Sequence, residues 1–554
     1  MSTARRIAMF LVAVIVLGPS GEGVAYELRT HGEITRGAFH ASTRLKDYFS
    51  DVNLKITDEF DPTSVTRVQQ LANFRNAATA RDWMIEGAIR EDDYRRHPLR
   101  EALGCRPPGN PPSQIDRPLQ HFFDVQRGGR GLTVLGLQHG FPAPDWALGR
   151  QGRGADITQN QLSVLDARVY QLRSLTEPAR QERDRSTALL FRSLGQVLHV
   201  LQDVAQPQHA RNEPHAGCLE VLAGEHSWFE EYIEDRALGR SFRTRGEPSP
   251  PLPLSGYDPP RFETYDSFWA TADRKGLADF SGRNFFSAGT NLPGCGGLPE
   301  PVCDAEAYIR HEAAFSFSTV DGGTIAGTVT QFLRTIQDAV TGDFIASVPV
   351  SSRSLWDQHL ERQGLAPSFS LNTLNYDAMS DLLLPRAVGY SAGLLDYFFR
   401  GKLEFELVAG ADENQATLVG VNRSEDPLGL GGQLTLHWED AAGRREPVQG
   451  PWLTLGAPVG KDRPFPELTF TWPADPERPP KRFVLAYQGP LGLEAGAVVG
   501  KVVESPALEQ AYQTALFDAN TQQWVFPWFL RTAEGIYVLP FEDSLPGQFV
   551  NDIK

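Results

Sequence analysis

The sequence lacks several features that would assign it to other classes of protein. The apolar stretch Ile7–Leu17 is too short to span a bilayer as a helix, which takes about 20 apolar residues. No internal repeat and no low-complexity tract occurs. With 41% hydrophobic and 10% aromatic residues, the chain is neither disordered nor an integral membrane bundle. Its 554 residues exceed what one hydrophobic core serves, so we expect two or three domains.

An excess of positive charge and two common catalytic motifs are also missing. The formal net charge is -16 at pH 7, so the chain is not a general binder of polyanions, although bound metal ions can create a local cationic site. The sequence has neither a Ser/His/Asp nucleophile motif nor a phosphate-binding glycine-rich loop. These absences argue against covalent serine catalysis and nucleoside-triphosphate chemistry.

Cysteine is scarce, with 4 residues and no Cys-x-x-Cys spacing, which disfavours a cysteine zinc site. Cys295 and Cys303 share a loop rich in Gly and Pro, so we expect them to form a local disulfide. That pairing leaves Cys105 to pair with Cys218. Buried free thiols are the alternative.

The N-terminus has the pattern of a secretory signal peptide. Arg5 and Arg6 precede the apolar stretch, and the small residues Gly23–Ala25 form a cleavage site. We therefore expect residues 1–25 to be removed, Tyr26 to become the first residue, and the protein to be secreted or periplasmic. An uncleaved membrane anchor is the alternative.

Residues 26–400 are predicted to form a mainly helical domain with loop insertions. Apolar residues recur at helical spacing in Val65–Ile89 and Ser186–Asp203. The helical pattern resumes later in the domain, and we expect Gly401 to cap its last helix. These later segments are Ala305–Ser316, Gly323–Ala346 and Tyr376–Phe399.

Residues 401–554 are predicted to form an all-β sandwich. Their short runs alternate between apolar and polar residues and are separated by Gly, Pro and Asp turns. The predicted strands are Leu403–Val408, Gln433–Trp438, Leu468–Trp472, Arg482–Tyr487 and Trp524–Leu530. The expected fold class is thus a mainly α N-terminal domain followed by a C-terminal β-sandwich.

A motif of histidines and a carboxylate gives the clearest chemical signal. The segment from His199 reads HVLQDVAQPQH, and on a helix the side chains of His199 and Asp203 point from the same face. We expect Pro207 to end that helix and to leave His209 on the exit turn.

A second pair with the same spacing follows at His226 and Glu230, on a predicted helix. Imidazole nitrogens and carboxylate oxygens are ligands that zinc accepts. A single pair at this spacing is commonly an ordinary contact on a helix face. Two pairs in helices rich in apolar residues favour a metal site, because buried charges need a partner.

These residues resemble a known family, the zinc-dependent phospholipases C and the single-strand-specific nucleases that share their helical fold. The resemblance covers about residues 26–235. The family's His-x-x-x-Asp helix with a later histidine after a Pro-x step is matched by His199, Asp203 and His209. Its later His-x-x-x-Glu helix is similar to His226 and Glu230.

Three further strings match the family. A His-x-x-Ile-x-x-x-Ala string begins at His31, close to the expected mature N-terminus. A Gly-x-x-x-x-Asp string runs from Gly87 to Asp92, and a His-Phe-aromatic-Asp string begins at His121.

The resemblance implies a cluster of about three zinc ions. One ion would bind Asp92, His121, His199 and Asp203. A second would bind His209, His226 and Glu230. The third would bind His31, a bridging Asp203, and the amino nitrogen and carbonyl oxygen of Tyr26. The amino group is a ligand only after the signal peptide is removed.

Some features depart from the family pattern. Tyr26 stands where the family usually has Trp, but only its backbone atoms would bind metal. Asp93 adjoins Asp92 and is an alternative to it, and the spacing from His209 to His226 is longer than in compact phospholipases. We expect four other histidines to be surface or packing residues: His40, His97, His139 and His215.

The resemblance implies hydrolysis of phosphodiesters by water activated between two zinc ions, with Asp92 as an alternative general base and the third ion stabilising the leaving alkoxide. We favour a phospholipid substrate, with peripheral membrane contact through the C-terminal domain, by analogy with long phospholipases C. A single-strand-specific nuclease or nucleotidase acting on nucleic acid is the alternative. A non-catalytic exported binding protein with structural zinc is the third hypothesis.

Overall fold

A computed structural model of the chain describes residues from Leu28 to Val550 with gaps. The described ranges are 28–60, 77–92, 117–134, 136–150, 160–215, 227–240, 250–292, 295–318, 323–354, 357–365, 368–409, 415–449, 453–473, 478–504, 510–513, 516–518, 523–525, 528–532, 535–539 and 548–550. The expected signal peptide, Tyr26, Asp93, His97, His226 and the pair Cys105 and Cys218 lie outside them, so predictions about these residues stay predictions. Within the described ranges no helix is long and apolar enough to cross a membrane.

The N-terminal part is built around α8 (Arg180–Asp203), a helix of 24 residues. It packs against α4 (Ala80–Arg90) on one side and α7 (Val164–Thr176) on another. The C-terminal half of α8 is buried, which confirms the predicted helix Ser186–Asp203 as a core element. The predicted segment Val65–Ile89 is described only in its last part, where α4 confirms a helix.

The sequence fixes where α4 and α7 begin. Thr79 and Ser163 are their N-caps, and each accepts a hydrogen bond from the backbone N–H of an aspartate three residues later. The two aspartates, Asp82 and Asp166, bond back to the cap backbone and complete capping boxes.

Two glycines let α4 and α8 touch backbone to backbone. A Cβ atom on Gly87 would lie 2.1 Å from the carbonyl oxygen of Arg192, and one on Gly195 would lie 1.9 Å from that of Met84. No side chain tolerates such contacts, so only glycine permits this approach. The crossing holds the C-terminal end of α4 against the C-terminal half of α8.

Other helices complete the core around α8. α14 (Thr373–Phe398) packs against α8 and α2 (Leu28–Ala41), and α11 (Trp228–Ala237) packs against α2. α14 confirms the predicted helix Tyr376–Phe399. The C-cap of α14 is Phe399, however, whose backbone N–H donates to the carbonyl oxygen of Leu395. The predicted C-cap at Gly401 is therefore wrong.

The shorter helices are α3 (Thr43–Asp51), α6 (Ala143–Leu148), α9 (Pro207–Ala210), α12 (Leu277–Asn284) and α13 (Asp357–Arg362). Short 3-10 turns are η1 (Pro118–Gln120), η2 (Val125–Arg127), η3 (Tyr265–Phe268), η4 (Ala288–Thr290), η5 (Cys295–Gly297) and η6 (Ala305–Ala307). Pro207 does not end α8 as predicted, because α8 already ends at Asp203. Pro207 instead starts α9, where its missing N–H leaves no helical hydrogen bond unmade.

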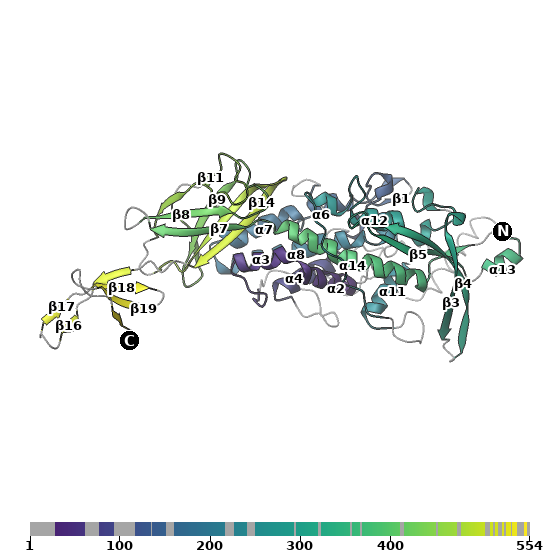
Figure 1. Ribbon diagram of the computed structural model, residues 1–554, viewed down its shortest axis with the longest axis horizontal. Coiled ribbons are helices and arrows are strands. Elements are labelled where there is room, and N and C mark those ends of the chain that lie inside the picture. Colours follow the sequence, from purple (N-terminus) through teal and green to yellow (C-terminus); the bar gives the residue numbers. More distant parts are fainter. Residues whose placement is uncertain are drawn as a thin grey trace, which may run out of the picture.

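Two segments predicted to be helical form antiparallel strands. β3 (Ile309–Ser318) pairs with β4 (Thr324–Gln337), β4 with β5 (Phe344–Arg353), and β5 with the short β6 (Phe369–Ser370). The predicted helices Ala305–Ser316 and Gly323–Ala346 are therefore wrong. Their composition explains the outcome, since Phe alternates with Ser before the turn and Thr, Ile and Val recur after it, which favours strands. Figure 1 shows this sheet at the end of the molecule opposite the sandwich.

The predicted β-sandwich is confirmed in the part of the chain after α14. One sheet has the strand order β10-β9-β13-β14 with β11 paired to β9, and the other has the order β12-β8-β7. Apolar side chains of both sheets, such as Leu418 and Phe483, share one core. The strands are β7 (Leu403–Ala409), β8 (Gln415–Asn422), β9 (Gln433–Glu439), β10 (Arg445–Pro447), β11 (Leu453–Thr454), β12 (Leu468–Thr471), β13 (Arg482–Leu491) and β14 (Glu494–Glu504).

The last strands form separate small sheets, of order β15-β18-β19-β20 and β16-β17. Figure 1 shows them in yellow beyond the sandwich. They are β15 (Gln510–Gln513), β16 (Leu516–Asp518), β17 (Gln523–Val525), β18 (Trp528–Thr532), β19 (Gly535–Leu539) and β20 (Gln548–Val550). The predicted strand Trp524–Leu530 is thus two strands in different sheets. A hairpin of β1 (Thr133–Val134) and β2 (Leu137–Gln138) lies in the helical part.

Buried ion pairs join the helical part to the sandwich. Arg168 of α7 contacts Glu494 of β14, with Nε 2.8 Å from Oε1, and Arg183 of α8 contacts Glu439 of β9 at 2.9 Å. Glu494 also accepts a hydrogen bond from Arg400, which follows α14. An apolar cluster of α7, β13 and β14 side chains lies beside these pairs. The N-terminal end of α8 therefore carries part of the sandwich contact, while its C-terminal half lies in the helical core.

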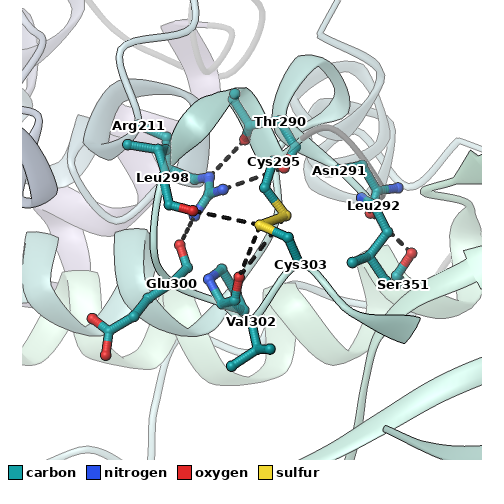
Figure 2. The surroundings of a disulfide bond; sticks show 12 residues. Arg211, Thr290, Asn291, Leu292, Cys295, Leu298, Glu300, Val302, Cys303 and Ser351 are labelled. Atoms are coloured by element: carbon teal, nitrogen blue, oxygen red, sulfur yellow. Dashed lines mark hydrogen bonds between the residues drawn. A yellow bond between two sulfur atoms is a disulfide. The ribbon is translucent and has the colours of Figure 1, made fainter. Parts of the chain in front are cut away.

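The predicted disulfide between Cys295 and Cys303 is confirmed. Figure 2 shows that the buried Arg211 lies beside this loop, where its guanidinium donates to Thr290 and to the carbonyl oxygen of Glu300. Arg211 follows α9 directly, so the loop closed by the disulfide fixes the end of that short helix.

Candidate metal centre

Histidines and carboxylates from separate elements meet inside the helical part. α2 supplies His31, and α8 supplies His199 and Asp203 from its last two turns. Asp92 lies just after α4, where the glycine contacts press that helix onto α8. The remaining members come from the end of η1, from α9 and from α11: His121, His209 and Glu230. Each of these residues is at most 4% exposed.

Asp203 lies at the centre of this group. Its Oδ1 is 3.1 Å from Nε2 of His31. Its Oδ2 is 2.6 Å from Nδ1 of His121, 3.2 Å from Nε2 of His199 and 4.0 Å from Nε2 of His209. Four imidazole rings therefore converge on one carboxylate.

Asp92 faces the same space from the end of α4. Its Oδ1 is 3.4 Å from Nε2 of His199 and 3.8 Å from Nδ1 of His121. Both of its oxygens are buried and make no hydrogen bond to any residue of the described ranges. A buried carboxylate in such a position requires a proton or a cation nearby.

Hydrogen bonds on the outer side of two rings fix which nitrogen faces the carboxylates. Nδ1 of His199 lies 2.6 Å from the carbonyl oxygen of Ala88, and Nδ1 of His31 lies 2.8 Å from Oε1 of Gln202. The amide of Gln202 donates through Nε2 to Thr35, so its Oε1 accepts. Both Nδ1 atoms therefore carry a proton, and both Nε2 atoms point at carboxylate oxygens.

Glu91 faces the His121 ring nitrogen that points away from Asp203. Its carboxylate accepts hydrogen bonds from Arg117 at 2.7 Å and from Trp146 at 2.6 Å, and Oε1 lies 3.7 Å from Nε2 of His121. Burial alone would raise the pKa of Glu91, but the Arg117 guanidinium and His121 lower it, so the group stays ionised. Sequence reasoning did not single out this carboxylate, because it precedes Asp92 without any pattern of its own.

A second group lies next to the first. His209 has its Nε2 3.9 Å from Oε1 of Glu230, and His215 has its Nε2 2.9 Å from the same oxygen. The rings of His209 and His215 meet edge to face with centroids 4.7 Å apart. His215 is only 3% exposed. Of the two expected positions for His215, surface or packing, the surface one is wrong, since the ring is buried against Glu230.

The electrostatics of the first group depend on its mixed charges. Burial alone would raise the pKa of Asp203, but the four surrounding histidines hold that pKa well below its usual range. Burial alone would lower the pKa of His199, but the carboxylates of Asp92 and Asp203 hold it well above its usual range. Burial lowers the pKa of His209 well below its usual value, and so keeps that ring neutral.

This donor set fits zinc. Three groups have ligand atoms within 4.8 Å of one another: His31, Asp92 and His199; His121, His199 and Asp203; and His209, His215 and Glu230. Each imidazole nitrogen that faces a carboxylate oxygen needs a proton or a cation between the two atoms, and a metal ion can take the place of the proton. Zinc accepts imidazole nitrogen and carboxylate oxygen at about 2.0–2.2 Å, and its histidine ligands are commonly oriented by an outer hydrogen bond.

Most of the predicted ligands lie close together. His31, Asp92, His121, His199, Asp203, His209 and Glu230 all lie in the two adjoining groups. Tyr26 and His226 lie outside the described residues, and α11 begins at Trp228, so the predicted helical spacing of His226 and Glu230 stays a prediction. His40 and His139 are exposed, as expected.

Comparison with known proteins adds little to this description. No protein-family model and no curated protein sequence matches the chain. Among solved structures, an alpha-toxin of Clostridium perfringens from an avian strain has 11% identity, with 87% of this chain and 99% of that chain covered and a TM-score of 0.25. An alpha-toxin of Clostridium absonum has 12% identity, 88% and 93% coverage and a TM-score of 0.24. At such TM-scores we base no inference on either likeness.

Proposed function

We propose that the protein is a zinc-dependent phosphodiester hydrolase of the phospholipase C type, with about three zinc ions at the two adjoining groups. The supporting observation is the orientation of the rings around Asp203. His31 and His199 each commit the Nδ1 proton to an outer acceptor and direct Nε2 at a buried carboxylate. Rings oriented in this way are suited to bind a cation.

The site residues would have different roles in hydrolysis. Zinc bound there would act as a Lewis acid and lower the pKa of coordinated water. Asp92 would accept the proton of the attacking water, while the water oxygen bonds to phosphorus and the bond from phosphorus to the leaving alkoxide breaks; the alkoxide would then take up a proton from water. Asp203 would hold the four rings in place, and burial of the whole group would strengthen its electrostatic interactions.

The substrate we propose is a phospholipid, and the place of action is outside the cytoplasm after removal of residues 1–25. The first part rests on the C-terminal β-sandwich, whose placement after the helical part resembles that in long phospholipases C. The second rests on the N-terminal sequence, and it would supply the α-amino group of Tyr26 as a ligand. In this proposal the C-terminal sandwich serves to place the helical part on a lipid surface.

The test is metal analysis combined with an assay on a soluble phosphodiester. Mature protein should contain about three zinc ions, should lose cleavage of a chromogenic choline phosphodiester when a chelator removes them, and should regain it with zinc. Protein with no bound zinc and the same activity would contradict the proposal.

Two substrates separate the proposed activity from its alternative. Vesicles of phosphatidylcholine should release phosphocholine, while single-stranded DNA should stay intact. Cleavage of DNA without cleavage of lipid would replace the phospholipase by the nuclease. Bound zinc with neither activity would favour the non-catalytic binding protein.

A further inference from the structure

His215 lies in the second group although no pattern in the sequence marks it. It follows α9 by five residues and occupies an irregular segment after Arg211. The ring is 3% exposed, its neighbours are Phe122 and His209, and its Nε2 lies 2.9 Å from Oε1 of Glu230.

The outer side of the His215 ring is arranged like those of His31 and His199. Its Nδ1 lies 2.8 Å from the backbone carbonyl oxygen of Glu213. A carbonyl oxygen only accepts, so Nδ1 carries the proton and Nε2 faces Glu230. The same combination of an outer acceptor and an inner carboxylate therefore occurs at His31, His199 and His215.

The distances in this group suit one small cation. One ligand atom each from His209, His215 and Glu230 lies within 4.8 Å of the others. Both ring nitrogens of His209 are buried and make no hydrogen bond to any residue that the structure describes. A cation between the three side chains would meet the lone pairs of two rings and the charge of one carboxylate.

We propose that His215 is a zinc ligand, and that it holds one ion together with His209 and Glu230. This inference rests on the proposed function, because it assigns a ligand to the same metal centre. Three protein ligands leave the fourth position of a tetrahedral zinc ion open for water or substrate. A fourth protein ligand would close it, so His215 bears directly on whether this ion is catalytic or structural.

The experiment uses the full-length mature protein and three variants. His215→Gln keeps a hydrogen-bonding side chain of similar reach, His226→Ala tests the ligand that the family resemblance implies, and His139→Ala removes an exposed histidine as the control. Zinc per chain is measured after dialysis against a chelator of known affinity. Cobalt-substituted protein is then compared by visible absorption, and circular dichroism checks that each variant is folded.

The expected result is the loss of about one zinc ion per chain in His215→Gln, with a changed cobalt spectrum. Loss of a residue that only orients a ligand weakens binding by roughly 10–100-fold, so a ligand should exceed that range. Full zinc content and an unchanged cobalt spectrum in His215→Gln, with loss of one ion in His226→Ala, would overturn the assignment and leave the proposed function intact. Wild-type protein without zinc would overturn both. If His215→Gln does not fold, the cobalt spectrum of His215→Asn decides in the same way.

Discussion

Replacement of Gly195 by alanine should damage the metal centre although the residue contacts no ligand. The new Cβ would lie 1.9 Å from the carbonyl oxygen of Met84, and such atoms approach no closer than about 3.0 Å, so α4 and α8 must separate by about 1 Å. The hydrogen bond from Nδ1 of His199 to Ala88 would then lengthen from 2.6 Å beyond hydrogen-bonding range.

The magnitude follows from three opposing contributions. Overpacking costs about 1–3 kcal/mol, and the lost buried hydrogen bond costs about 1 kcal/mol more. The better helix propensity of alanine offsets about 1 kcal/mol. We expect a net loss of about 2 kcal/mol in unfolding free energy, and zinc binding weakened roughly 10–100-fold because His199 is no longer oriented.

Thermal denaturation and competitive zinc titration measure both effects of Gly195→Ala. The matched control is Gly456→Ala, where a Cβ would meet no atom within 4 Å. Wild-type melting temperature and wild-type zinc affinity in Gly195→Ala would refute the idea that the close helix contact positions the site.

Three further predictions concern ligands, domain contact and pH. Asp203→Ala should lose more than one zinc ion, since four rings converge on it, whereas the exposed His139→Ala should keep all of them in the same metal analysis. Glu494→Gln should lower unfolding free energy by about 3 kcal/mol in urea titrations, because the buried Arg168 loses its carboxylate partner and Arg400 loses one of two, while the exposed Glu404→Gln should change it by less than about 1 kcal/mol. Burial raises the pKa of Glu234 from 4.5 to about 7, so the stabilisation that this group gives should be complete below pH 4.5 and should fall by about 3 kcal/mol as pH rises to 7. Glu234→Gln should remove this pH dependence of the unfolding free energy. An unchanged pH dependence in the variant would contradict the prediction.

The local pattern was sufficient to predict those parts of the site that lie on regular elements. His199 and Asp203 could be paired because helical spacing fixes their common face. Likewise, Asp92 could be placed through the string that begins at Gly87. The structure supplies the reason for that glycine, since Gly87 has no side chain to collide with the backbone of Arg192 in α8.

Residues outside regular elements could not be predicted in this way. His215 lies in an irregular segment, and its position depends on long-range packing that spacing does not encode. The signal that could have found it is burial beside Glu230, which becomes visible only in three dimensions.

The strands β3 and β4 were missed for a different reason. The windows Ala305–Ser316 and Gly323–Ala346 contain apolar residues at several spacings, and short apolar runs do not distinguish helix from strand. Cross-strand pairing decides the outcome here, because ten register pairs join β3 to β4. The alternation of Phe and Ser at 315–318 was the usable signal.

The length of α8 has a consequence for how the protein meets a substrate. Arg183, near the start of this helix, contacts the sandwich, and Asp203, its last residue, lies at the centre of the metal site. The intervening residues of one continuous helix span roughly 30 Å at 1.5 Å per residue. A helix resists both bending and twisting, so the sandwich is not a tethered accessory that swings freely. In the function we propose, the sandwich would act as a spacer of set length and angle, and the number of turns in α8 would set the distance between a surface bound by the sandwich and the candidate metal site.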